Sequence, residues 1–362
     1  MSHKKVIGIM CVALLFMVML GIIVRGDVKG ADRMDATMLA MEGGKLSSEE
    51  AKKLEDKLKA NPNDLLSRTK LLGYYSRKRF QSDFARQARQ RHIMWIIQNR
   101  PDAKIAGRPD TSLNPVLDGE MYYEAKKLWL KQVETHKENT AILGNAAHFF
   151  IIHDRDVAEN LLKKAQALEP DNPEWSKRLG HLYSLGLSRK SGEAKREAAT
   201  KSLNQLEKTL SNTTEEINRF YMLDKLAKAA FESGDVKKAR AYATELLNKA
   251  AQYRNKWNYG NAIHHGNLIL GRLALKSGDL EKAKEYLIKA GKTPGSPQLN
   301  SFGPNMTLAK ELLEKGEKEV VIKYFQLCAN FWKRKRHRER LKNWTSIVKK
   351  DGIPDFGANL DY

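Results

Sequence analysis

Apolar positions recur every three or four residues along most of the chain, and one such pattern occurs twice in its second half. The stretches AKAAFESGDVKKARAYATEL (227–246) and GRLALKSGDLEKAKEYLIKA (271–290) both place small and apolar residues on either side of Ser-Gly-Asp. This spacing predicts two helices joined by a turn at the glycine, with small residues where the helices touch. The matching positions are Leu226, Ala227, Ala230, Gly234, Ala239, Ala243 and Leu246 in the first copy and Leu270, Gly271, Ala274, Gly278, Ala283, Leu287 and Ala290 in the second.

Related spacing occurs in further segments. A pair of helices cannot bury its apolar side alone, so such units are expected to stack on one another. The sequence therefore predicts an all-α fold built from repeated helical pairs. The third copy has its matching residues at Leu308, Ala309, Leu312, Gly316, Val321, Phe325 and Cys328. Residues 139–172 supply Ile142, Ala146, Phe149, Ala158, Leu162, Ala165 and Pro170, and Leu179, Gly180 and Tyr183 begin another first helix.

The pattern resembles the tetratricopeptide repeat, a unit of about 34 residues with small and large apolar positions and a closing proline. The stretches LKANPNDLLSRTKLLGYY, LGNAAHFF and LEPDNPEWSKRLGHLYSLG also resemble segments of bacterial tetratricopeptide-type proteins, and the likeness covers most of residues 47–362. The resemblance implies a tetratricopeptide-like helical-hairpin solenoid that takes part in protein–protein interaction, and it implies no reaction.

The start of the chain carries a membrane signal. Lys4 and Lys5 precede the uncharged run Val6–Val24, which as a helix would span about 28 Å, close to the roughly 30 Å of a hydrocarbon core. A cleaved signal peptide usually has a shorter apolar region, so we expect an uncleaved N-terminal transmembrane signal anchor, with a cleaved signal as the alternative. The expected location is the bacterial inner membrane with a periplasmic body, or an exported soluble form after cleavage.

The expected domain organisation follows from these segments. Residues 27–45 contain glycines and little apolar periodicity, which predicts a flexible tether, and a capping-box pattern at 47–50 predicts the start of the folded body. The full division is 1–26 as signal anchor or signal peptide, 27–45 as tether, 46–102 as N-terminal helical repeat, 103–118 as loop, 119–330 as tetratricopeptide-like repeats and 331–362 as a basic C-terminal capping helix and tail.

The composition offers little chemistry for catalysis. The two cysteines, Cys11 and Cys328, cannot build a disulfide framework, and the nine histidines include no pair with metal-ligand spacing. The chain also lacks a Gly-x-Ser-x-Gly nucleophile motif, a phosphate-binding glycine loop and a dinucleotide fingerprint. We therefore expect no catalytic residue, no metal and no cofactor, and an enzyme with an unfamiliar site is a third interpretation.

One set of residues is a candidate partner-binding groove. In tetratricopeptide families the ligand lies on the concave face that the first helix of each pair forms. The adjoining stretch WNYGNAIHHGN (257–267) has the aromatic, Asn and His content that suits peptide recognition. The alternative is that these side chains are simply solvated. The residues that map to the concave face are Lys177, His181, Tyr221, Lys228, His265 and Arg272.

The second set is the basic segment FWKRKRHRERLKNW (331–344), in a chain whose formal net charge is +21. As a helix it would have an apolar seam and a basic face that could meet phosphate groups or acidic lipid. A solubilising cap for the repeat array is the competing interpretation. The basic residues are Lys333, Arg334, Lys335, Arg336, Arg338, Arg340 and Lys342, against Glu339 alone.

These observations favour a non-catalytic helical-repeat scaffold that binds a protein or peptide partner at the cell envelope. The alternative is nucleic-acid or anionic-surface binding through the basic 333–342 helix, although an exported body would rarely meet nucleic acid. At the end of the chain FGANL (356–360) echoes FGPNM (302–306), and we expect Ile353, Phe356 and Leu360 to fold back onto the last repeat.

Overall fold

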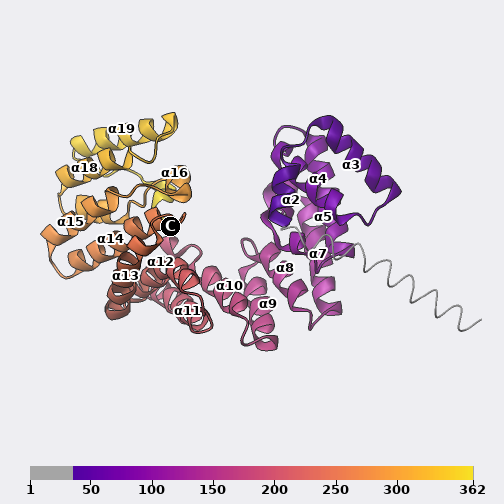
Figure 1. Cartoon of the computed structure of the whole chain (residues 1–362), viewed down its shortest axis with the longest axis horizontal. Helices are drawn as coiled ribbons and strands as arrows, with labels where there is room; N and C mark the ends of the chain where they lie inside the picture. The colour runs from indigo at the N-terminus through magenta and orange to yellow at the C-terminus, as the bar shows by residue number, and fades with distance from the viewer. Residues whose placement is uncertain (1–35, 362) are drawn as a thin grey trace, which may run out of the picture. The chain divides into compact units, whose positions relative to one another are not determined.

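The computed structural model describes residues 36–361, which form an all-α protein without a strand among them, as the helical periodicity predicts. The chain divides between Glu169 and Pro170 into two compact units (Figure 1). The predicted anchor Val6–Val24 and the first part of the predicted tether lie outside the described residues. None of the helices within residues 36–361 is long and apolar enough to cross a bilayer.

The first helix described in unit 1 is one that the sequence analysis did not predict. Helix α2 (Ala36–Gly43) buries Leu39 and Ala40 and packs on α4, so the prediction of a tether is wrong for its last part. The two helices touch through their backbones, because a Cβ at Gly73 would lie 1.8 Å from the Ala40 carbonyl oxygen. The other helices are α3 (Ser48–Ala60), α4 (Leu65–Lys78), α5 (Asp83–Asn99), α7 (Glu120–Thr135), α8 (Thr140–Phe150) and α9 (Arg155–Leu168).

Two local predictions for unit 1 can be compared with its backbone. The capping box at the start of α3 is confirmed, since Glu50 N–H donates to the Ser47 hydroxyl over 3.2 Å and Ser47 N–H donates to the Glu50 carboxylate over 2.7 Å. Residues 103–118, predicted as a loop, instead contain short helical turns, and the Asn145 amide from α8 donates to the carbonyls of Pro101 and Ala103 just before them. The turns are η1 (Lys104–Gly107), η2 (Pro109–Thr111) and α6 (Pro115–Asp118).

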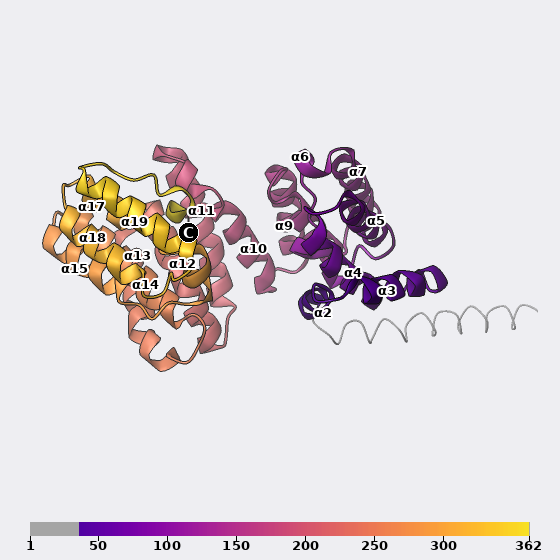
Figure 2. The same cartoon turned by 90° about the horizontal axis from the view of Figure 1, so that it is seen from above.

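Unit 2 is a succession of helices in which each helix from α10 to α15 packs on the next (Figures 1 and 2). Its longer helices are α10 (Pro173–Ser184), α11 (Gly192–Ser211), α12 (Glu216–Ser233), α13 (Val236–Ala250), α14 (Tyr259–Lys276), α15 (Leu280–Gly291), α18 (Lys318–Cys328) and α19 (Lys335–Lys349). Its short elements are η3 (Leu187–Arg189), η4 (Ala251–Tyr253), α16 (Pro297–Phe302), α17 (Thr307–Leu313) and η5 (Gly357–Leu360).

The three copies predicted from the sequence share one turn geometry. Gly234, Gly278 and Gly316 have φ angles of 89°, 84° and 84°, a left-handed conformation that favours glycine. The residue after each glycine donates its N–H to a carbonyl five residues earlier, as in the bond from Asp235 to Ala230. The same turn therefore ends α12, α14 and α17, and the chain reverses into α13, α15 and α18.

The helix interfaces beside these turns are closely packed. Small residues allow neighbouring helices to approach until side chains meet backbone. The Ala283 carbonyl oxygen of α15, for example, would lie 3.5 Å from a Cβ placed on Gly271 of α14. The predicted small and apolar positions in the second helix of each pair are at most 1% exposed: Ala239, Ala243, Leu246, Ala283, Leu287, Ala290, Val321, Phe325 and Cys328.

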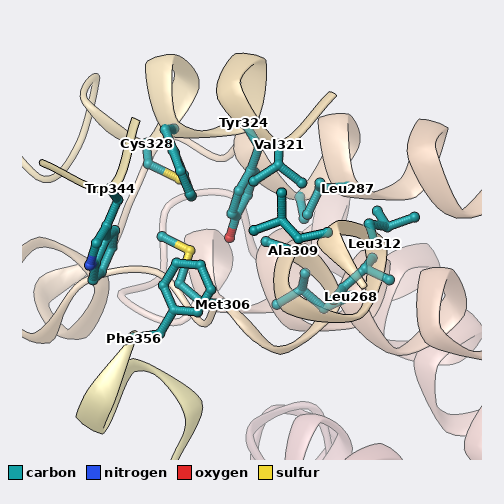
Figure 3. Packing of buried hydrophobic residues seen from close by; sticks show 14 of the residues in the cluster. Leu268, Leu287, Met306, Ala309, Leu312, Val321, Tyr324, Cys328, Trp344 and Phe356 are labelled. Atoms are coloured by element: carbon teal, nitrogen blue, oxygen red, sulfur yellow. The ribbon is translucent and has the colours of Figure 1, made fainter. Parts of the chain in front are cut away.

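The end of the chain returns to this core. Phe356 is 2% exposed and its ring centroid lies 5.0 Å from that of Trp344. Figure 3 shows Phe356 pointing into the apolar cluster that also contains Met306 and Tyr324. Leu360 packs against the same cluster, but Ile353 is 46% exposed. The predicted fold-back is therefore confirmed for Phe356 and Leu360 and wrong for Ile353.

The close packing of α15 predicts a difference between two leucine substitutions. Ala283→Leu adds volume at a fully buried position, so the free energy of unfolding should fall by about 1–3 kcal/mol. Lys282→Leu, on the exposed side of the same helix, should change the free energy of unfolding by less than about 0.5 kcal/mol. Urea unfolding followed by circular dichroism measures both values, and equal values would contradict the assigned interface.

The fold-back of the tail predicts a second matched pair. Phe356→Ala removes a buried ring and should lower the free energy of unfolding of unit 2 by about 3–5 kcal/mol. Ile353→Ala removes a largely exposed side chain and should cost far less, within about 1 kcal/mol. Thermal unfolding of the two variants is the measurement, and an unchanged midpoint for Phe356→Ala would show that the tail is not part of the core.

Candidate functional site

The six predicted groove residues lie on three helices of unit 2. Lys177 and His181 are on α10, Tyr221 and Lys228 on α12, and His265 and Arg272 on α14. Helix α12 packs on α14 although α13 separates them in sequence. We call the side of α10, α12 and α14 that carries these six side chains the candidate face.

Arg272 is held by carboxylates of its own chain. Its guanidinium lies 2.8 Å from Glu232 and 2.7 Å from Glu311, and the group stacks 4.1 Å from the centroid of the Phe231 ring. Its side chain is only 11% exposed, and Lys195 makes a further ion pair with Glu232 at 2.6 Å. The positive charge of Arg272 is thus neutralised in place, so Arg272 holds α12, α14 and α17 together rather than offering a free cation to a ligand.

Lys228 is the cation that faces the end of the chain. Burial, with Glu232 opposing it, lowers the pKa of Lys228, and its ammonium group donates to the main-chain carbonyl of Asp361 over 3.2 Å. The side-chain hydroxyl of Ser188 donates to the Asp361 carboxylate. Figures 1 and 2 both place the end of the chain beside α12. The residue that follows the short turn η5 therefore lies on the candidate face, with Asp361 between Ser188 and Lys228.

His265 lies next to Lys228 on the neighbouring helix. Loss of solvation, followed by the positive charge of Lys228, lowers the pKa of His265 to about 4. The imidazole is therefore neutral at pH 7 and can donate or accept a hydrogen bond. Lys228 and His265 together present one cation and one neutral polar ring to whatever binds here.

The remaining members of the set are more exposed. The Tyr221 ring packs 5.2 Å from the half-exposed Trp257 ring, as the composition of 257–267 suggests for a recognition surface. Loss of solvation, followed by the charges of Lys225 and Arg178, lowers the pKa of His181. Lys177 forms an exposed ion pair with Glu174 on its own helix at 3.4 Å. The structure thus groups Lys228, His265 and Arg272 closely, while Lys177 pairs locally.

Sequence reasoning missed the residues that complete this face. Asp361 and Lys228 are separated by 133 positions, and no local pattern connects them. Glu232 and Glu311 neutralise Arg272 from other helices, so the outward position of Arg272 in the repeat did not reveal its pairing. The only related expectation was that Phe356 and Leu360 fold back onto the last repeat, which brings the end of the chain toward the helices of unit 2.

A buried histidine beside His265 shows how unit 2 uses polar groups in its core. His264 is fully buried, with Nδ1 3.1 Å from the Ala290 carbonyl oxygen and Nε2 3.1 Å from the Asn305 main-chain nitrogen. Nδ1 must carry the proton, because Nε2 accepts from the Asn305 N–H. Burial, and then the neighbouring His265, lowers the pKa of His264 to about 3. His264 is therefore a neutral link between helices and not an acid or base.

The predicted basic segment forms the first half of α19 and the residues before it. Lys333, Arg334, Lys335, Arg336, Arg338, Arg340 and Lys342, which we call the basic patch, are all exposed. The apolar seam faces inward, since His337, Leu341, Trp344 and Val348 are buried. Burial, and then the charges of Arg336, Arg334 and Arg340, lowers the pKa of His337. The positive charges of the patch thus lower the pKa of a histidine on the same helix.

Within residues 36–361, three features bear on chemistry other than partner binding. No group of three or more His, Cys, Asp or Glu side chains within that range is arranged to hold a metal ion. A hollow of about 830 Å³ lies along α13 beside Val236, Arg240 and Thr244, and none of the six groove residues lines it. Cys328 is buried, and burial raises the pKa of its thiol, which disfavours the reactive thiolate.

No protein-family model matches the chain, and no curated protein matches it. The tetratricopeptide resemblance therefore remains a prediction.

The lowered pKa values of His264 and His265 predict how the stability of unit 2 depends on pH. An unfolded chain takes up a proton on each histidine near pH 6.5, whereas folded His264 and His265 stay neutral down to about pH 3 and 4. The unfolded state then binds more protons, so the free energy of unfolding should fall as pH drops from 6.5 to 5, by up to about 1.4 kcal/mol per pH unit for each histidine.

Chemical denaturation at several pH values measures this slope. His264→Gln should lower the stability at pH 7.5 but give a shallower decline toward pH 5, because one of the two groups that titrate only when unfolded is gone. A slope identical to that of the unchanged chain would contradict the assignment.

Proposed function

We propose that the chain is a tetratricopeptide-like solenoid, without catalytic activity, that binds a protein or peptide partner at the cell envelope through the candidate face. The identical glycine turns after α12, α14 and α17 and the packing of each helix on its neighbour support the repeat architecture. The uncharged run Val6–Val24 supports attachment to the inner membrane, with the body in the periplasm or exported if the signal is cleaved.

One observation carries the binding proposal: the chain's own C-terminal segment already lies on this face. Lys228 donates to the Asp361 carbonyl and Ser188 to its carboxylate, so the face accommodates a peptide backbone and an acidic side chain together. Tyr221, Trp257 and His265 add aromatic and neutral polar surface nearby, the mixture common at peptide-binding sites. The partner would present a peptide with an acidic residue to Lys228.

Site-specific photo-crosslinking in cells that produce the full chain tests this proposal. A photo-reactive residue at Lys225, exposed on α12, should give a discrete adduct with the partner, whereas the same residue at Lys237 on α13 should not. Lys228→Glu should reduce the yield at position 225 about tenfold, corresponding to about 1.4 kcal/mol of binding free energy. Deleting residues 361–362 should raise the cross-linking yield at position 225, because Asp361 no longer covers Lys228.

Equal adducts at positions 225 and 237 would contradict the proposal, as would a Lys228→Glu variant that still cross-links at full yield. Circular dichroism of each variant controls for folding, and the exposed position 237 provides the matched background.

A further inference from the structure

The basic patch on α19 concentrates seven exposed cations within residues 333–342. Among the described residues, none of its seven Lys and Arg side chains forms an ion pair, although all seven are exposed. Some exposed helical lysines elsewhere are paired one turn away, as in Lys53 with Glu49 at 3.0 Å. Others, such as Lys225 and Lys237, form no ion pair within residues 36–361. What distinguishes this segment is therefore the density of unpaired cations, with Glu339 as the only acidic residue among positions 333–342.

These charges do not stabilise α19. The first turn of the helix holds no acidic residue, so Lys335 and Arg336 face the positive end of the helix dipole. Arg336 and Arg340, like Arg338 and Lys342, are four residues apart, a spacing at which like charges repel. A cap that served only solubility would need polar side chains but not this unbalanced set, so the patch is better explained by an anionic partner.

The burial of the apolar seam limits how such a partner can bind. Trp332 and Trp344 are 1% and 3% exposed, and their ring centroids lie 5.9 Å apart within the core. These rings are therefore not available to stack on unpaired bases or to insert between lipid chains. What remains exposed on this part of α19 is cationic or polar, which suits a flat array of negative charges contacted through electrostatics.

We propose that the basic patch binds the acidic headgroups of a phospholipid bilayer as a peripheral, non-inserting contact. The apolar run Val6–Val24, a sequence-predicted anchor, would bring the same chain to a bilayer and raise the local concentration of headgroups. Each Lys or Arg close to an acidic bilayer strengthens binding about fivefold. Three cations that share one side of the helix, Lys335, Arg338 and Lys342, therefore suffice for a strong dependence on lipid charge.

Lipid photo-crosslinking of the full chain tests this proposal. A photo-reactive residue replaces Asn343, which is exposed on α19, and the chain is reconstituted into phosphatidylcholine vesicles with or without phosphatidylglycerol. Lipid adducts at position 343 should be about tenfold more abundant in the acidic vesicles and should disappear at high salt, which screens charges beyond a few ångströms. The combined variant Lys335→Glu, Arg338→Glu and Lys342→Glu should lose them.

The matched control reverses three exposed charges elsewhere in unit 2: Lys237→Glu, Arg240→Glu and Lys256→Glu. It changes the net charge equally and should keep the adducts. Equal adducts on neutral and acidic vesicles would overturn the proposal, as would full adducts from the α19 variant. If duplex DNA binds the reconstituted chain and removes the lipid adducts, the patch is a nucleic-acid site and the lipid assignment is wrong. Thermal unfolding of both variants shows whether they remain folded.

Discussion

The turn at the left-handed glycine is the constraint on which the architecture of unit 2 depends. At Gly234, Gly278 and Gly316 similar left-handed φ angles and the same backbone hydrogen bonds reverse the chain after a first helix. A side chain at these positions would strain the turn, although there is open space around each of them or, at Gly234, only ordinary contact. Because the reversals are alike, the corresponding positions of the second helix are buried each time. Alanines occupy most of them in α13 and α15, and larger residues such as Val321 and Phe325 occupy them in α18.

This regular packing determines which side chains lie together on the candidate face. Helices α12 and α14 are first helices of neighbouring pairs, so their outward residues lie side by side and Lys228 meets His265 and Arg272. Arg272 forms ion pairs with two carboxylates, whereas Lys228 donates a hydrogen bond to the tail. The tail itself is held by the apolar burial of Phe356 and by Asn359, whose amide donates to the Pro304 carbonyl over 2.8 Å. The packing of the tail into the core of unit 2 thus places Asp361 next to Lys228 on α12.

The sequence predicts local features of this fold well and distant ones poorly. Helical periodicity and the Ser-Gly-Asp turn identify buried positions such as Ala239 and Ala283, because burial follows directly from spacing along one helix. Helix α2 escaped prediction because it is short and its burial depends on Gly73 in another helix. The pairing of Arg272 and the contact of Asp361 with Lys228 join residues far apart in sequence, so no local pattern could reveal them.

The central claim is that a partner binds the face of α10, α12 and α14 that Asp361 now covers. Hydrogen–deuterium exchange of the full chain, alone and in complex with the partner isolated from cross-linked membranes, tests it most directly. The account predicts added protection in α10, α12 and α14, together with loss of protection around residues 359–361 as the tail is displaced. Protection confined to α13 or α19, with the tail unchanged, would contradict it.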